Sequence, residues 1–203
     1  MNAAALDIPG VWRASEAPAD ARIGTHSAAL DAAFGGWPQG ALTQIDSAAP
    51  GLGFSLLLPT LAALTAAGRL VMLIDPPHLP YAPALASRGV ALEQLFWLEA
   101  PAAAEALWAA EQTLRSGVFG AVAYWGAPLP ASAGRRLQLA AAAAQCPLFC
   151  FGAGPADGAG YAALRLAVTA ADGRLRVTVL RCRGRRVGHS VLYGDLPVDR
   201  DAA

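Results

Sequence analysis

The stretch of residues 44–58, QIDSAAPGLGFSLLL, constrains the fold more than any other. It begins as an apolar strand, passes through a turn that contains Pro50, Gly51 and Gly53, and continues as an apolar helix. A phosphate-binding loop (P-loop) has this arrangement, with the spacing G-x-x-x-x-G-K-S/T. In such a loop the main-chain N–H groups surround the phosphates, while the lysine and the hydroxyl reach the terminal phosphate and Mg²⁺.

The charged part of that loop is missing here. On the P-loop spacing Ala48 replaces the first glycine, Gly53 is the second, Phe54 replaces the lysine and Ser55 supplies the hydroxyl. No lysine elsewhere can compensate, because all 15 basic residues are arginines. We therefore predict a degenerate loop over Ala48, Gly51, Gly53, Phe54 and Ser55, in a protein that is not an enzyme and uses no cofactor.

Two interpretations of the loop remain. The favoured one is a structural turn between strand and helix, in which the Phe54 ring fills the former nucleotide pocket. The alternative is that main-chain N–H groups of the turn and of the helix N-terminus still hold a nucleotide, as bare helix N-termini hold anions.

Composition limits the class of protein. A chain of 203 residues with 55% hydrophobic and 15% charged residues fits one domain with a large core and apolar surface for a partner. Cys146, Cys150 and Cys182 are too few and too irregularly spaced for a disulfide framework or a zinc site. No signal peptide and no apolar run of about 18 residues is present, so we expect a cytoplasmic protein without a membrane contact.

Strand and helix patterns alternate along the chain. Apolar runs that predict strands lie at residues 41–46, 70–75, 95–98, 118–125 and 147–152, of which 70–75 and 118–125 are typical of buried strands. Helix patterns lie at 55–67, 102–116 and 134–145. From Leu164 to Val179 the apolar residues alternate around the turn Asp172-Gly173, which predicts a β-hairpin. The fold class is therefore α/β, a mostly parallel sheet flanked by helices, with a C-terminal β-hairpin.

We divide the chain into an N-terminal arm (residues 1–22), a core domain (23–180) and a basic C-terminal extension (181–203) with little regular pattern. The arm has one bulky anchor, Val11-Trp12-Arg13. It either packs on its own domain or docks on another protein. Residues 161–203 carry 8 Arg against 4 Asp and Glu, whereas residues 1–160 carry 7 against 11, so the C-terminal end is electropositive.

The core resembles the RecA family over almost its whole length. The segment IGTHSAALDAAFGGWPQG (23–40) is similar to the one with which RecA proteins enter their core, one residue shorter before the glycine pair. The segment IDPPH (74–78) matches the strand end that carries the RecA catalytic glutamate, and Pro77 stands in its place. The segment TLRSG (113–117) precedes the strand that ends in the Mg²⁺-associated aspartate, where Trp125 stands. The resemblance therefore implies a RecA-like core that has lost its catalytic residues.

A closer resemblance is to the ImuA family, degenerate RecA-like and SulA-related accessory proteins of bacterial translesion synthesis. It covers nearly the full chain and rests on these segments: VWRASE (11–16), GGWPQGAL (35–42), PGLGFSLLL (50–58), PPHLPYAPAL (76–85), ALWAAEQTLRSG (106–117) and RRLQLA (135–140).

The ImuA resemblance implies a DNA-damage-induced, SOS-type adaptor in mutagenic DNA repair. The implied partners are the RecA recombinase, the Y-family polymerase-like protein ImuB and, indirectly, an error-prone replicative-type DNA polymerase. It further implies a cytoplasmic protein that associates with the nucleoid under DNA damage, and self-association is a further possibility. Two alternatives stay open: a SulA-like inhibitor that binds the tubulin-like division GTPase, and a nucleotide-binding switch without hydrolysis.

Two groups outside the loop are candidate contact residues. His78 and Tyr81 lie in a proline-rich stretch after a buried strand, where functional residues gather in α/β sheets, and we expect them to bind a partner rather than to catalyse. Arg181, Arg183, Arg185 and Arg186 are either a solvated strand face or a weak contact to DNA or to an acidic partner.

Overall fold

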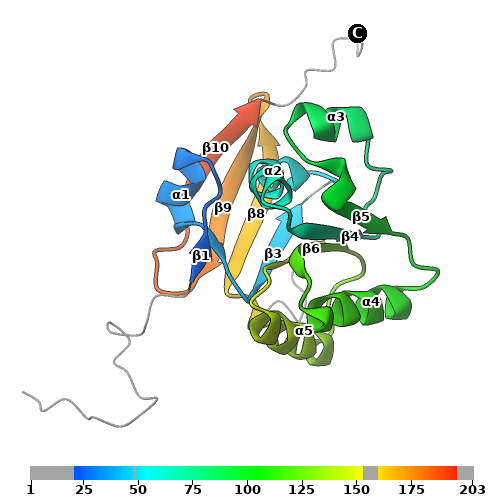
Figure 1. The fold of residues 1–203 in the computed structure, drawn as a ribbon. Helices are drawn as coiled ribbons and strands as arrows, with labels where there is room; N and C mark the ends of the chain where they lie inside the picture. Colours follow the sequence, from blue (N-terminus) through cyan, green and yellow to red (C-terminus); the bar gives the residue numbers. More distant parts are fainter. Residues whose placement is uncertain (1–20, 48, 153–159, 196–203) are drawn as a thin grey trace, which may run out of the picture.

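A computed structural model describes residues 21–47, 49–152 and 160–195 of the chain. Its main feature is a sheet of eight strands in the order β10-β9-β8-β3-β7-β6-β4-β5, with helices on both faces (Figure 1). The strands from β8 to β5 in this order run parallel, and β9 and β10 are antiparallel to their neighbours. The predicted class, a mostly parallel α/β sheet with a C-terminal hairpin, is confirmed.

Five parallel strands arise from the apolar runs of the sequence. They are β3 (Leu42–Ser47), β4 (Leu70–Ile74), β5 (Leu95–Leu98), β6 (Phe119–Trp125) and β7 (Leu148–Gly152). Except for its first residue, β6 is buried throughout, as expected for a strand covered on both faces. The strand β7 lies between β3 and β6, so the carboxyl ends of β3, β7, β6 and β4 open on one edge of the sheet.

The helices form two layers. One face is covered by α1 (Ala28–Phe34), α2 (Leu58–Ala66) and α3 (Ala82–Ser87), and the other by α4 (Ala103–Ser116) and α5 (Ala131–Ala144) (Figure 1). The first layer has Trp37 at its centre, which is fully buried, packs on Phe34 and Phe149, and donates from Nε1 to Thr60 Oγ1 at 3.0 Å. Trp37 and Pro38 also form β2, which pairs with β1 (Arg22–Ile23).

The hairpin has the expected turn but continues further than predicted. Strands β8 (Leu164–Ala171) and β9 (Arg174–Cys182) meet at Asp172 and Gly173, whose φ values are 51° and 70°. The expectation of little regular pattern after residue 181 is wrong, because β10 (Ser190–Asp195) pairs with β9 and completes the sheet. Val191 and Tyr193 of β10 pack against the core, but this short alternation is hidden in a segment rich in Arg and Gly.

Two helices begin elsewhere than expected. The helix predicted from residue 55 is split into a 3₁₀ turn η1 (Phe54–Leu56) and α2, because Pro59 has no N–H to donate to the carbonyl of Ser55. The helix α5 begins at Ala131 instead of residue 134, since the N–H of Gly134 already donates to the carbonyl of Pro130 at 2.9 Å. A second 3₁₀ turn, η2 (Leu92–Gln94), leads into β5.

Candidate functional site

The degenerate P-loop has the backbone of a strand-to-helix turn. Between β3 and η1 the chain turns at Gly51 and Gly53, whose φ values of 75° and 93° favour glycine. A Cβ on Gly53 would lie 3.3 Å from Ile45, and one on Gly51 would lie 3.3 Å from the His78 ring. The turn therefore packs closely against the core on one side and against the loop after β4 on the other. Ala48 lies outside the described residues.

An aromatic row includes Phe54 and Trp125, two positions where the resemblance puts catalytic polar groups. The Phe54 ring contacts Trp125 edge-on with centroids 5.4 Å apart, and Trp125 stacks on Phe151 at 4.5 Å with an angle of 6° between the rings. The three side chains come from η1 and from the carboxyl ends of β6 and β7. A row of rings holds neither a phosphate nor a metal ion, so this arrangement favours apolar contact over phosphoryl chemistry.

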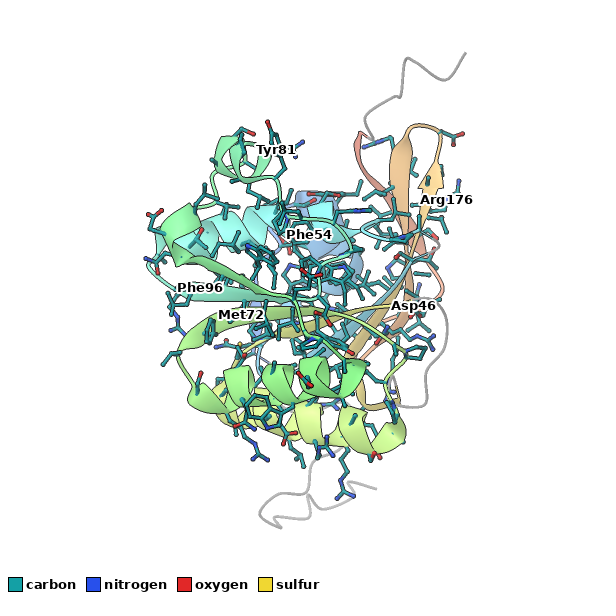
Figure 2. The ribbon with its side chains drawn as sticks, turned by 90° about the vertical axis from the view of Figure 1, so that its right-hand side faces the viewer. Asp46, Phe54, Met72, Tyr81, Phe96 and Arg176 are labelled. Carbon is teal, nitrogen blue, oxygen red and sulfur yellow. The ribbon has the colours of Figure 1, made fainter. Side chains whose placement is uncertain are left out.

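The aromatic row borders a cavity of about 290 Å³, which we call the apolar pocket. Its wall is the proline-rich segment after β4 together with α3, and its floor is Phe54, Leu73 and Trp125. It is lined by Gly51, Phe54, Leu58, Leu73, Pro76, Pro77, His78, Leu79, Pro80, Tyr81, Ala84, Leu85, Arg88 and Trp125. Figure 2 shows Phe54 near the middle of the molecule and Tyr81 above it, on the side of α3. The structure thus brings together six of our candidate residues, namely Gly51, Phe54, Pro77, His78, Tyr81 and Trp125.

The apolar pocket has few polar groups. Arg88 and His78 are the lining residues that can carry charge, and no Asp or Glu lines the cavity. Trp125 is 7% exposed, and its Nε1–H has no hydrogen-bond acceptor among the described residues. Leu79 and Tyr81, at the outer end of the pocket, are 74% and 70% exposed. These features fit an apolar side chain of a partner that also brings a hydrogen-bond acceptor or a carboxylate.

A second, smaller cavity of about 180 Å³ lies next to the first. Gly51, Pro77 and Trp125 line both cavities, and Ser47, Gly126 and Phe151 line only the smaller one. Beside it Tyr124 is buried at the end of β6, and desolvation, together with nearby Cys150 and Asp75, raises its pKa to about 12. Tyr124 is therefore a neutral core residue rather than a general base at ordinary pH.

Asp75, which the RecA resemblance places at the end of the catalytic strand, has a structural role. Its φ is 51°, and its Oδ1 accepts the N–H of Ala100 at 2.6 Å. Its own N–H donates to the carbonyl of Leu98 at 2.8 Å. Asp75 thus fixes the segment that follows β4 against the end of β5.

The arginine cluster does not contribute to the apolar pocket. Arg181 lies on β9 and donates to the carbonyl of Gly160, and the other three arginines follow in the β9–β10 connection. Arg185 and Arg186 line a separate cavity of about 510 Å³ beside α1, together with His189. In Figure 1 this connection and α3 lie on opposite sides of the molecule. The positive region and the apolar pocket are therefore two distinct surfaces.

Sequence reasoning missed one partly buried ion pair. Arg165 on β8 lies 2.7 Å from Asp46 Oδ2 on β3, and Gln44 Nε2 donates to Asp46 Oδ1 at 3.1 Å. From the sequence, the alternation of Arg165 with Leu164 and Leu166 indicates only that its side chain lies on the opposite face of the strand from theirs.

The last observations concern residues outside the described ranges and features that are absent within them. Val11, Trp12 and Arg13 of the arm are outside the described ranges. Within those ranges no group of three His, Cys, Asp or Glu residues could hold a metal ion, and all three cysteines are free and buried. No described helix is long and apolar enough to cross a bilayer.

Comparison with known proteins leaves the family unassigned. No family model matches the chain, and no curated protein does. Among solved structures the chain is similar to SulA from Pseudomonas aeruginosa, with 29% sequence identity, over 55% of this chain and 98% of that one, at a TM-score of 0.47.

Proposed function

We propose that this chain is a non-catalytic accessory protein of SOS-induced translesion DNA synthesis, which acts in the cytoplasm at damaged DNA through protein–protein contacts. The proposed partners are the RecA recombinase and an ImuB-like Y-family polymerase homologue, with an error-prone replicative-type polymerase recruited indirectly. The ImuA-like segments of the sequence support this assignment. The observation that carries the non-catalytic part is the aromatic row of Phe54, Trp125 and Phe151.

The apolar pocket suits docking better than hydrolysis. An ATPase of this type needs a lysine on the terminal phosphates, a carboxylate to activate water and a carboxylate near Mg²⁺. The RecA resemblance puts Phe54, Pro77 and Trp125 at the corresponding positions, and the described lining of the pocket has no Asp or Glu. A pocket with an apolar floor, an exposed aromatic at its outer end and one arginine fits an anchor side chain from a partner protein.

The first test is capture of partners from damage-treated cells of the source bacterium, with the full chain as bait. We expect recovery of RecA or the polymerase-like protein, and loss of that recovery in Leu79→Asp, which puts a carboxylate at the outer end of the pocket. The matched control is Leu139→Asp on α5, since Leu139 is 61% exposed and lies outside the pocket. Recovery of the division GTPase alone would replace the proposal with cell-division inhibition.

The second test addresses nucleotide binding. Ligand that binds only the native state must raise the melting temperature by mass action. We expect ATP with Mg²⁺ to leave the melting temperature unchanged and phosphate release to stay at background. A concentration-dependent rise without phosphate release would instead support the nucleotide-binding switch.

A further inference from the structure

The last strand on one side of the sheet, β5, carries exposed apolar side chains. The strand β5 pairs with β4 on one side only, and no described strand lies on the other. Phe96, Trp97 and Leu98 are 46%, 48% and 38% exposed, and none of the four residues of β5 is charged. Leu92 and Val118, 38% and 55% exposed, flank β5 and β6. Figure 2 shows Phe96 at the outer edge of the molecule, beside Met72 of β4.

The main-chain groups that β5 leaves for a further strand can be assigned. The carbonyl of Leu98 accepts the N–H of Asp75, so the peptide groups of Leu98 point toward β4. Because these groups alternate along a strand, those of Leu95 and Trp97 point away from the sheet. The N–H of Ala100 donates to Asp75, which continues the alternation and turns Glu99 outward. Among the described residues, the outward main-chain groups of Leu95, Trp97 and Glu99 therefore have no partner strand, and they form a template for strand addition.

We propose that a second copy of this chain occupies this edge, β5 against β5, in an antiparallel pair with two-fold symmetry. Such an interface must be self-complementary, because each residue meets its counterpart under the same rotation. If the axis passes through Trp97, the two copies of Trp97 form a hydrogen-bonded pair, and Leu95 pairs with Glu99 of the second copy. All three outward-facing residues are then satisfied.

Backbone pairing selects this register over its neighbour. With the axis at Trp97, Glu99 lies opposite Leu95 of the second copy, which is the first residue of β5. With the axis at Phe96, Glu99 would lie opposite Glu93, which belongs to the 3₁₀ turn η2 and offers no strand to pair with. The Trp97 register also places Phe96 opposite Leu98 of the second copy, so the exposed apolar side chains cover one another on both faces.

This inference is independent of the proposed function, because it uses β5 and not the apolar pocket. The first test is sedimentation of the full chain over a concentration series. We expect a monomer–dimer equilibrium, weakened about tenfold or more by Trp97→Lys, which puts a charge in the centre of the interface. The matched control is Trp108→Lys on α4, where Trp108 is 64% exposed, and it should leave the equilibrium unchanged. A monomer at every concentration, or equal weakening in both variants, overturns the proposal.

Cysteine cross-linking tests the register and does not depend on affinity. Phe96 and Leu98 of opposite copies form a non-hydrogen-bonded pair, with Cα atoms about 4.5 Å apart, within reach of a disulfide. A mixture of Phe96→Cys and Leu98→Cys should therefore form a disulfide-linked dimer on mild oxidation, whereas neither variant alone should. The native cysteines are buried and give little background. Efficient cross-linking of Phe96→Cys with itself would show the other register and overturn the proposed one.

Discussion

The two edges of the sheet differ in how they meet solvent. At the β5 edge Phe96, Trp97 and Leu98 are exposed and uncharged. At the β10 edge the pairing with β9 is irregular between Tyr193 and Asp195, and Arg174 donates to the carbonyl of Gly194 at 3.1 Å. Phe96 and Arg176 lie on opposite sides of the view in Figure 2. Bulges and charged side chains are the features by which sheets block further pairing, so the β10 edge is protected and the β5 edge is not.

This difference separates two kinds of surface on one domain. The parallel end of the sheet carries the apolar pocket and the apolar edge, and both suit contact with protein. The antiparallel end carries most of the arginines of the C-terminal segment, which suit solvent, phosphate or an acidic partner. The lengthening of the sheet by β9 and β10 therefore places positive charge away from the apolar contact surfaces.

The largest expected effect is at the junction of the two halves, where Arg165 meets Asp46. Their side chains are 23% and 10% exposed. Arg165→Met leaves the Asp46 carboxylate with little water and without its cation, and we expect a loss of about 3 kcal/mol in the free energy of unfolding. Urea denaturation measures it. The control Arg176→Met, on the exposed face of β9, should change the value by less than about 0.5 kcal/mol.

A double substitution sharpens this prediction. If the loss comes from the unpaired carboxylate, Asp46→Asn combined with Arg165→Met should recover most of it, since Asn removes the charge and keeps an acceptor for Gln44 Nε2. Equal losses in the single and double variants would mean that the lost packing and hydrogen bonds of the Arg165 side chain cause the effect, and not the unpaired charge of Asp46.

A second, smaller effect is loss of stability in alkali. Burial raises the pKa of Tyr124 from 10.0 to about 12 and that of Cys146 from 9.0 to about 12, and both lie in the parallel half. Their native neutral forms hold protons that the unfolded chain releases, so stability is complete below pH 9 and falls as the pH rises toward 12. Each group contributes up to about 1.4 kcal/mol per pH unit within its window.

The measurement is urea denaturation at pH 8 and at pH 10.5. Wild type should lose stability between the two, and Cys146→Ala with Tyr124→Phe should lose clearly less. Tyr124→Phe alone should cost little at pH 8, because the Tyr124 hydroxyl has no hydrogen-bond partner among the described residues. If the double variant declines as steeply as wild type, other groups cause the alkaline loss.

The sequence predicted local structure better than the order of the strands. The P-loop spacing placed the turn at Gly51 and Gly53, and Asp172-Gly173 placed the hairpin, because backbone conformation at those residues is decided locally. The apolar run Leu95–Leu98 predicted a strand, but the sequence alone does not show whether a strand lies at the centre or at the edge of a sheet. The sequence also could not pair Arg165 with Asp46, because the two residues are 119 positions apart.

A third prediction tests whether the antiparallel end binds nucleic acid. Arg183→Ala with Arg185→Ala should weaken retention on single-stranded DNA and lower its salt slope by about 0.7 for each lost phosphate contact. The control Arg69→Ala with Arg135→Ala removes the same charge from exposed positions of the parallel half. Retention that is unchanged and independent of salt would leave the arginine cluster as a solvated face.

The smallest expected effect is at the β10 edge itself. Leu192 is 39% exposed on β10, close to the exposure of Leu98 on β5, so Leu192→Lys adds the same charge to the other end of the sheet as Trp97→Lys adds to β5. Because the bulge and Arg174 already block this edge, we expect no change in self-association and less than about 0.5 kcal/mol in the free energy of unfolding. Sedimentation and urea denaturation of the two lysine variants, side by side, give the answer. Dissociation by Leu192→Lys would mean that the β10 edge also takes part in assembly, and the contrast between the edges would then fail.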